Sequence, residues 1–271
     1  MFTNVPGVPA APPTHGLVAS AVRPDIPRWE QGLAWIPERC ATAYRLVPVC
    51  DAPAAGYEPP RSGSAYYQPV ALQVADECST MSGPVDPERV RRVAEAQFGF
   101  AVARELWEGD LSATDTFTVG GDTLSNAHLA SAAADTVGGS AADPLPGLGR
   151  LEQAALEATH GQSVMLHVPV TLLPQLATYL RPVGQTLITF AGNTVVADGG
   201  YTGTGPAGQA AGATVWAYAT APVAVLASPW VIDLDDRNNV DRSVNTRTVW
   251  ATRVFAATFD PCVLLATEIT L

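Results

Sequence analysis

Residues 84–109 read PVDPERVRRVAEAQFGFAVARELWEG, and they predict a long helix over residues 86–108. Asp86 can cap the first turn, and Pro87 suits the first helical position because the amide that proline lacks has no partner there. Gly109 suits the left-handed residue that ends many helices. At about 1.5 Å per residue the helix would be roughly 30 Å long, about the width of a small domain. We therefore expect a sizeable part of the protein to lie along it.

One face of this predicted helix is apolar, because its apolar residues recur at spacings of three and four. They are Val90, Val93, Ala94, Phe98, Ala101, Val102 and Leu106. On the solvent side we expect three charged pairs one turn apart, each contributing about 0.2–0.5 kcal/mol: Glu88 with Arg92, Arg91 with Glu95, and Arg104 with Glu108. Gly99 does not suit a helix, because glycine in a helix interior lowers the stability by about 1 kcal/mol relative to alanine unless close packing requires it.

The composition describes a globular, acidic chain. With 271 residues, 47% of them hydrophobic, it can bury a core in one elaborate domain or two. The formal net charge of −11 argues against a basic nucleic-acid-binding surface, although it does not exclude a protein that encloses nucleic acid. All 15 cationic residues are arginine, so chemistry that needs a lysine amine is excluded.

Targeting signals and metal motifs are not evident in the sequence. Residues 1–30 lack the features of a signal peptide, and no apolar run approaches the roughly eighteen residues that span a bilayer, so we expect a soluble protein made in the cytosol. Cys40, Cys50, Cys78 and Cys262 form no CxxC pair, which disfavours a zinc site. We expect free, mostly buried thiols, with a Cys40–Cys50 or Cys40–Cys78 bridge as the alternative.

The chain begins with segments that cannot form a core alone. Residues 1–28 are rich in proline and predict an extended arm, with Trp29 and Trp35 anchoring it to folded protein. Residues 40–50 and 65–78 read as strands, and the second alternates apolar and small or polar residues from Val70 onward. The loop DAPAAGYEPPRSGS joins them into a long hairpin, which needs a third surface from its own domain or from a neighbouring copy.

Beyond the long helix the sequence alternates short helices and strands, as in a compact α/β subdomain. We expect helices at 123–134, 151–161 and 171–180, a turn at 143–149, strands at 163–170, 185–190, 194–198, 213–220 and 223–228, and a mobile glycine-rich loop at 199–212. Residues 246–271 predict a long β-rich run that Pro261 bends or places at an edge.

Several motifs suggest chemistry, but each has a simpler interpretation. The match GTGPAG at 203–208 to a dinucleotide fingerprint precedes a strand instead of opening a helix. The acidic stretch IDLDDRNN lacks the glycine and distant glutamate of a calcium loop. His15, His128, His160 and His167 could act as bases near Ser125 or Ser163, yet no hydrolase signature surrounds them. Aromatic residues on strands could stack on sugars but are more often core or interface residues: Tyr66, Tyr67, Trp216, Tyr218 and Trp230.

The order of these parts resembles the major capsid proteins of tailed bacteriophages, whose Hong Kong 97-type shell fold is shared with encapsulins. The run TRTVWATRVFAATF, the turn DPC and the strand VLLATEI are similar to the end of such proteins. The resemblance implies an α+β fold in these parts: an N-terminal arm at 1–39, an extended hairpin loop at 40–78, a spine helix with part of a peripheral domain at 79–119, an axial domain at 120–222, and the last strands of the peripheral domain at 223–271.

The resemblance also implies a function without catalysis, cofactor or metal. Copies would associate as hexamers and pentamers into an icosahedral shell around a double-stranded DNA genome, inside a virion assembled in the host bacterial cytoplasm. Scaffolding, portal and decoration proteins would be separate partners, and the absence of lysine excludes a lysine–asparagine cross-link. The alternatives are an encapsulin-like compartment, a phage tail or adaptor protein, and a histidine-dependent hydrolase. The expected assembly contacts are Trp29, Trp35, Tyr44, Leu46, Tyr57, Arg61, Tyr66, Tyr67 and Tyr201.

Overall fold

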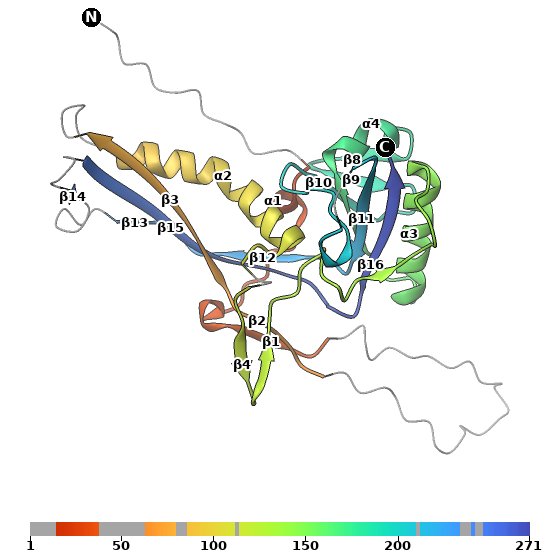
Figure 1. Cartoon of the computed structure of the whole chain (residues 1–271), viewed down its shortest axis with the longest axis horizontal. Coiled ribbons are helices and arrows are strands. Elements are labelled where there is room, and N and C mark those ends of the chain that lie inside the picture. Colours follow the sequence, from red (N-terminus) through yellow and green to blue (C-terminus); the bar gives the residue numbers. More distant parts are fainter. Residues whose placement is uncertain are drawn as a thin grey trace, which may run out of the picture.

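The computed structural model describes residues 15–37, 63–79, 86–111, 114–209, 212–233, 240–241 and 246–271. Helix α2 (Pro87–Glu108) lies along a long five-stranded sheet with its N-terminal half and reaches a seven-stranded sheet with its C-terminal half (Figure 1). The architecture is α+β. The long helix organises both sheets, as its sequence predicts.

Both predicted ends of α2 are confirmed. The Asp86 carboxylate accepts a hydrogen bond from the Glu88 amide at 3.0 Å, and Pro87 occupies the first helical position. Gly109 has φ 64° and its amide donates to the Glu105 carbonyl at 2.8 Å. Local side-chain chemistry therefore determines where this helix begins and ends.

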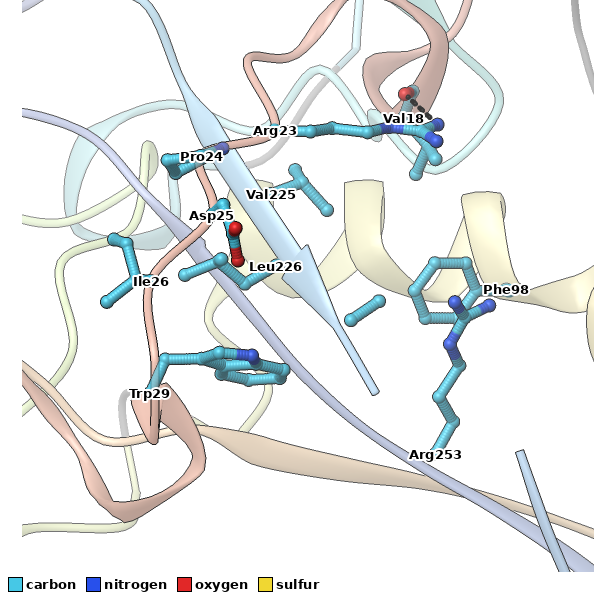
Figure 2. A pocket seen from close by; sticks show the side chains of 11 residues that line it. Val18, Arg23, Pro24, Asp25, Ile26, Trp29, Phe98, Val225, Leu226 and Arg253 are labelled. Atoms are coloured by element: carbon cyan, nitrogen blue, oxygen red, sulfur yellow. Dashed lines mark hydrogen bonds between the residues drawn. The ribbon is translucent and has the colours of Figure 1, made fainter. Parts of the chain in front are cut away.

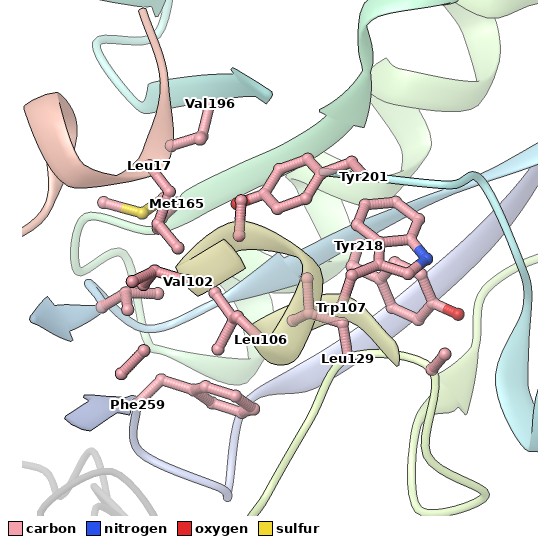
Figure 3. Packing of buried hydrophobic residues seen from close by; sticks show 14 of the residues in the cluster. Leu17, Val102, Leu106, Trp107, Leu129, Met165, Val196, Tyr201, Tyr218 and Phe259 are labelled. Atoms are coloured by element: carbon pink, nitrogen blue, oxygen red, sulfur yellow. The ribbon is translucent and has the colours of Figure 1, made fainter. Parts of the chain in front are cut away.

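The predicted apolar stripe of α2 is correct at most positions but too narrow. Val93 and Phe100 are 41% and 49% exposed, whereas Ala103 and Trp107, which the stripe leaves out, are fully buried. The reason is the position of the C-terminal turns between the two sheets, which cover Val102, Leu106 and Trp107 from more than one side and leave Arg104 exposed (Figure 3). Periodicity anticipates only one covered face.

The predicted ion pairs on α2 are wrong in their partners. The described ion pairs of its arginines are Arg89 with Asp76 at 3.1 Å, Arg91 with Glu88 at 3.0 Å, Arg92 with Asp86 at 3.7 Å, and Arg104 with Asp110 at 2.8 Å. Three of these arginines reach acids outside the helix instead of residues one turn away. Because nearly all these groups are solvent-exposed, the pairs contribute little to stability.

The five-stranded sheet is built on β15 (Thr246–Thr258), which pairs antiparallel with β3 (Val70–Ser79) from Thr246↔Ser79 to Phe255↔Val70. Its other edge holds β12 (Ala224–Ala227), β13 (Val231–Asp233) and β14 (Val240–Asp241). The predicted alternation is confirmed, since Val70 and Val74 face α2 and are buried.

The strand predicted at 65–78 is split in two. Strand β2 (Ala65–Tyr67) pairs with β1 (Leu33–Trp35), and β3 begins three residues later. Between them, the side chain of Asn126 bonds both backbone groups of Gln68, accepting from its amide and donating to its carbonyl at 2.7 Å each. This side chain replaces a strand partner, so the ladder is interrupted at Gln68.

The seven-stranded sheet has the order β6-β16-β11-β7-β10-β9-β8. Its strands are β6 (Asp135–Thr136), β7 (Met165–Pro169), β8 (Leu180–Val183), β9 (Thr186–Thr189), β10 (Thr194–Asp198), β11 (Thr214–Thr220) and β16 (Leu264–Thr270). One face packs on α3 (Pro144–Ala158) through residues such as Val215 and Ala217, and the other packs on α2 through Trp216 and Tyr218. A sheet covered on both faces explains why β7 is entirely buried.

The helix predicted at 123–134 is wrong. Residues 117–124 form a hairpin of β4 (Phe117–Val119) and β5 (Asp122–Leu124), turning at Gly120 and Gly121, both with positive φ. Further on, the amides of Leu129 and Ala130 donate to the carbonyls of Leu106 and Trp107 at 2.8 and 2.9 Å. These amides satisfy the end of α2, so they do not form a helix of their own.

Helix α3 begins earlier than predicted, because the supposed turn at 143–149 is its first part. Asp143 takes the N-cap position, and Pro144 and Pro146 lie within the first turn, where proline is tolerated. Gly147 lies against the side chain of Ile269. A Cβ atom at position 147 would stand 3.2 Å from the Ile269 Cγ1 atom. In place of the helix expected at 171–180, the structure has only the short helix α4 (Leu173–Leu176). Pro174 lies in the first turn of this helix and does not interrupt it.

The described part of the proline-rich N-terminal segment packs on the body of the same chain, contrary to the prediction that it cannot bury itself. In α1 (Leu17–Ser20), the Leu17 side chain is fully buried and its amide donates to the Asp198 carboxylate at 2.9 Å. Val22 then bonds to the edge of β12, donating to the Val223 carbonyl at 2.9 Å. Burial raises the pKa of Asp198, which is the acceptor for this segment.

The glycine-rich segment 199–208 is a packed loop, so the prediction of a mobile loop is wrong for these residues. Gly200 lies against the α2 backbone, where a Cβ would stand 2.5 Å from the Phe100 carbonyl oxygen. The Trp107 indole donates to the Thr204 carbonyl at 3.2 Å and fixes the next turn. A strand, β11, follows this segment, so the dinucleotide interpretation is correctly rejected.

The predicted break at Pro261 is confirmed, since β15 ends at Thr258 and β16 starts at Leu264. Strand β16 then joins the seven-stranded sheet beside β11. In that turn Cys262 is disulfide-bonded, which corrects the expectation of a free thiol. Its partner cysteine is not among the described side chains.

Gly99 in the middle of α2 and Gly200 in the loop that packs against α2 allow a matched test of this packing. A Cβ at Gly99 would meet no atom within 4 Å, whereas one at Gly200 would overlap the α2 backbone. We expect Gly99→Ala to stabilise the protein by about 1 kcal/mol and Gly200→Ala to destabilise it by about 1–3 kcal/mol. Urea unfolding of both variants measures this. Equal effects of the two substitutions would contradict the described packing.

Candidate assembly surface

The base of the long hairpin is the first part of the expected assembly surface. Strands β1 and β2 pair antiparallel, with Leu33 opposite Tyr67 and Trp35 opposite Ala65. The intervening residues 38–62 lie outside the described residues, as do the expected strand at 40–50 and the expected contacts Tyr44, Leu46, Tyr57 and Arg61. The described part therefore places the two ends of the predicted hairpin next to each other.

Four of the expected contact residues lie at this base, but two of them face inward. Trp29 and Tyr67 are 8% and 2% exposed and pack together against Leu226 and Ala256 of the five-stranded sheet. Burial raises the pKa of Tyr67 well above its usual value. Trp35 and Tyr66 are partly exposed, so part of each side chain stays at the surface of the hairpin base.

The N-terminal segment holds this base against the sheet and leaves a cavity of about 350 Å³ beside it (Figure 2). On one wall the Arg253 guanidinium lies 4.4 Å from the centre of the Phe98 ring, and on another Arg23 donates to the Val18 carbonyl at 3.0 Å. The predicted role of Trp29 as an internal anchor is confirmed, since its ring lines this cavity and packs on the sheet.

Tyr201 lies in the core instead of at the surface. Its ring is 4% exposed, its centroid is 4.7 Å from that of Trp107, and its hydroxyl lies 2.9 Å from Nδ1 of His167. Burial raises its pKa well above the usual value. In this conformation the side chain offers almost no area to a second molecule.

The structure exposes an apolar surface that the sequence analysis missed. We call the face of β3, β15 and β13 that points away from α2 the outer ribbon face; it includes Ala71, Ala75, Val231 and Trp250. Trp250 stands opposite Ala75 and Asp233, and Val231 opposite Thr252. Val231 and Trp250 are 66% and 38% exposed. The same face also carries the exposed polar residues Gln73, Glu77 and Asp233. Because a half-buried antiparallel sheet normally has polar residues on its open face, the exposed Trp250 and Val231 make this face a candidate contact surface.

This geometry, a long helix on a twisted ribbon beside a compact α/β lobe, matches solved shell proteins. No family model and no curated protein matches the sequence. A chain of Gordonia phage Cozz matches with a TM-score of 0.56 and 14% identity, covering 100% of this chain and 92% of that one. A capsid chain of an empty GTA particle matches with a TM-score of 0.53 and 11% identity, covering 100% of this chain and 94% of that one. The SrpI encapsulin of Synechococcus elongatus PCC 7942 matches with a TM-score of 0.59 and 9% identity, covering 100% of this chain and 92% of that one.

The chain has the Hong Kong 97-type shell fold. The likeness extends over the whole chain, from the N-terminal segment to the last strand, although the sequence identities are too low to show more than the fold. Within this shell fold, α2 is the spine helix, the five-stranded sheet with α2 forms the ribbon, and the seven-stranded sheet with α3 forms the compact lobe.

The histidines of this shell fold lie apart from one another in structural positions. His167 is fully buried on β7, with Tyr201 on one ring nitrogen and the Thr220 hydroxyl at 2.9 Å on the other. His128 packs beside Gly109 at the end of the spine helix, and His15 lies 3.1 Å from the Gln185 carbonyl. A general base must reach a substrate, and His167 has no exposed surface with which to do so.

The other chemical motifs do not form a site in the described residues. Trp216 and Tyr218 are buried, and Trp230 lies edge-on to Phe98, so these rings form no open sugar platform. The described residues contain no cluster of His, Cys, Asp and Glu side chains suited to a metal ion. Each described helix is too short or too polar to cross a membrane. Most of IDLDDRNN, residues 234–239, lies outside the described ranges.

The burial of His167 leads to a testable prediction for the pH dependence of folding stability. Burial lowers the pKa of His167 to about 3, whereas an exposed histidine titrates near 6.5. The unfolded chain therefore binds a proton below about pH 6.5 that the folded chain does not. This contribution to folding stability should be complete above that pH and fall by about 1.4 kcal/mol per pH unit between roughly pH 6 and pH 4.

His167→Gln removes the titrating group, so its stability deficit relative to wild type should shrink as the pH falls. Urea unfolding at pH 7, 6, 5 and 4 measures this. Thr220→Val is the matched control, since it removes a hydrogen-bond partner of His167 and keeps the titration. A deficit of His167→Gln that stays constant with pH would contradict the prediction.

Proposed function

We propose that this protein is the major structural subunit of an icosahedral shell, without enzymatic activity, and that its copies associate as hexamers and pentamers around a double-stranded DNA phage genome. The observation that carries the proposal is the likeness of fold over the entire chain to a chain of Gordonia phage Cozz and to a GTA capsid. The corresponding location is the virion, after assembly in the host bacterial cytoplasm.

The surfaces of the single chain support self-association. The outer ribbon face carries Trp250 and Val231, and the open side of the spine helix carries Val93 and Phe100 one above the other. A monomer gains nothing from exposing these side chains, whereas contact with further copies would bury them. The partly exposed Trp35 and Tyr66 at the hairpin base stay in the proposal as assembly contacts, as do Tyr44, Leu46, Tyr57 and Arg61.

Charge supports a container better than a nucleic-acid-binding protein. A net charge of −11 repels a polyanion, so DNA inside such a shell would move past the wall without strong attachment. Without lysine the shell cannot form lysine–asparagine cross-links, so its stability comes from subunit contacts, disulfides or separate partners. Scaffolding, portal and decoration proteins are the partners that this proposal includes.

An encapsulin-like compartment is the second candidate, and its support is the likeness to the SrpI encapsulin at a TM-score of 0.59. Purified particles separate the two functions. Negative-stain images of the purified protein test for closed shells, and the ratio of absorbance at 260 and 280 nm of nuclease-treated particles from infected cells tests for packaged DNA. A protein that remains monomeric under all assembly conditions would overturn both candidates.

Shortening the hairpin tests its role in assembly. Removing residues 52–64 should leave the subunit folded, because a hairpin tip contributes nothing to a core. It should reduce the yield of closed particles by about tenfold or more. Circular dichroism measures the fold and negative-stain microscopy counts the particles. A normal yield of particles from the deletion variant would contradict the proposed contact.

The outer ribbon face gives a second test. Trp250→Glu introduces a charge at a 38% exposed position opposite Asp233 and loses the buried part of the ring, so it should destabilise the isolated subunit by about 1–3 kcal/mol without unfolding it. In a shell contact the same charge would be desolvated, so particle formation should fail. Trp250→Phe, which keeps an apolar ring, is the control and should assemble. Equal assembly of both variants would exclude this face as a contact.

A further inference from the structure

The cavity of about 350 Å³ beside the hairpin base carries two arginines, and we call it the two-arginine cavity (Figure 2). Arg23 comes from the N-terminal segment and Arg253 from β15, so two distant parts of the sequence meet there. The rest of the wall is mainly apolar and includes Val18, Ile26 and Trp29. Arg23 is exposed and Arg253 is partly exposed, so solvent reaches both side chains.

The guanidinium group of Arg253 is held in a fixed orientation. Its Nε atom donates to the Ser228 carbonyl at 2.7 Å, and its Cζ atom lies 4.4 Å from the centre of the Phe98 ring and 5.4 Å from that of Trp230. Among the described residues, its two Nη atoms have no acceptor. A planar group that is already oriented loses little conformational freedom when it binds an anion.

The second guanidinium group also has free donors. One Nη atom of Arg23 donates to the Val18 carbonyl at 3.0 Å, and Figure 2 shows this group on the same side of the cavity as that of Arg253. Burial lowers the pKa of Arg253, while the charge of Glu95 raises it and the charge of Arg23 lowers it. The two cations therefore repel each other, and an anion that contacts both would offset this repulsion.

Two carboxylates lie near this pair without neutralising it. Asp25 lines the cavity, and Glu95 acts on Arg253 through its charge. The ion pairs within the described part of the chain join other residues, so neither carboxylate binds Arg23 or Arg253 directly. The cavity wall carries two cations and one anion in a chain whose net charge is −11. Such a local excess of positive charge attracts anions.

The arrangement of the donors favours a phosphate group over a carboxylate. The two oxygens of a carboxylate lie in one plane and match a single guanidinium group, whereas the tetrahedral oxygens of a phosphate can accept from two such groups on different walls. The apolar residues leave room for the organic part of a small phosphate ester. A long polyanion is disfavoured, because the acidic chain as a whole repels it.

We propose that the two-arginine cavity binds a phosphate group, either as free phosphate or as part of a small phosphate ester, through the Nη donors of Arg253 and the guanidinium group of Arg23. The bound anion then links the N-terminal segment to the ribbon. All these residues belong to one chain, so the inference goes beyond the proposed shell function and does not depend on it.

Isothermal titration calorimetry of the full-length chain with inorganic phosphate, at constant ionic strength, measures the binding. We expect a dissociation constant in the millimolar range or tighter. Arg253→Met keeps an apolar chain over Phe98 but removes the charge, and Arg23→Gln removes the other charge. Each should weaken binding about tenfold or more, the effect of losing charged hydrogen bonds.

Arg181→Gln, at an exposed arginine on β8, is the matched control and should leave phosphate binding unchanged. Circular dichroism checks that each variant is folded. Because Arg23 lies in an exposed segment, Arg23→Gln keeps the test decisive even where Arg253→Met is unstable. Absence of phosphate binding to the wild type, or equal binding by Arg23→Gln and Arg181→Gln, would overturn the proposal.

The chemical class of the ligand is tested in the same titration with adenosine monophosphate, acetate and a short oligothymidylate. Adenosine monophosphate should bind at least as tightly as inorganic phosphate. Acetate and the oligothymidylate should bind about tenfold more weakly or not at all. Tighter binding of acetate or of the oligothymidylate than of phosphate would overturn the assignment to a small phosphate ligand.

Hydrogen exchange tests whether the anion links the N-terminal segment to the ribbon. The Ala21 amide donates to the Leu17 carbonyl and the Val22 amide to the Val223 carbonyl, so both report on the docking of this segment. Phosphate should slow the exchange of these amides in the wild type and leave it unchanged in Arg253→Met, because that substitution lies on a different strand. Exchange that phosphate does not slow in the wild type would contradict the link.

Discussion

The last turns of α2 must be buried between two sheets, and the rest of the structure depends on this constraint. Leu106 and Trp107 are 2% and 0% exposed and lie between two sheets that share no strand. Apolar side chains from both sheets meet these turns of the helix in one cluster (Figure 3). Removing so much apolar surface from water is the main favourable term in folding, so the helix determines how the lobe and the ribbon fit together.

The same constraint explains which surfaces stay open. Beyond the lobe, the N-terminal half of α2 is covered on one side only, by the ribbon, so Val93 faces solvent, and Phe100 just after the middle of the helix is also exposed. The ribbon in turn has α2 on one face, whereas its other face is covered by Trp29 and Tyr67 at one end and leaves Trp250 exposed further along. A chain built in this way exposes apolar surface that contact with other molecules would bury.

The assembly surface was harder to predict than the fold. Aromatic residues are enriched in cores and in interfaces alike, so the sequence does not reveal which role each one has. Tyr67 and Tyr201 became core residues because neighbouring segments cover them, whereas Trp250 is exposed because the opposite face of β15 holds the contacts to α2. The two-arginine cavity and the disulfide of Cys262 depend on neighbours distant in sequence, which no local pattern indicates.

The sequence by itself determined the ends of α2, the alternation in β3 and the break at Pro261, because caps, periodicity and proline act within a few residues. The tertiary structure alone decided three further features. Residues 129 and 130 bond the end of α2 instead of forming a helix, Leu17 is held by Asp198, and β16 joins the seven-stranded sheet beside β11. Each depends on a hydrogen-bond partner far away in the chain, and a partner of that kind exists only after the chain has folded.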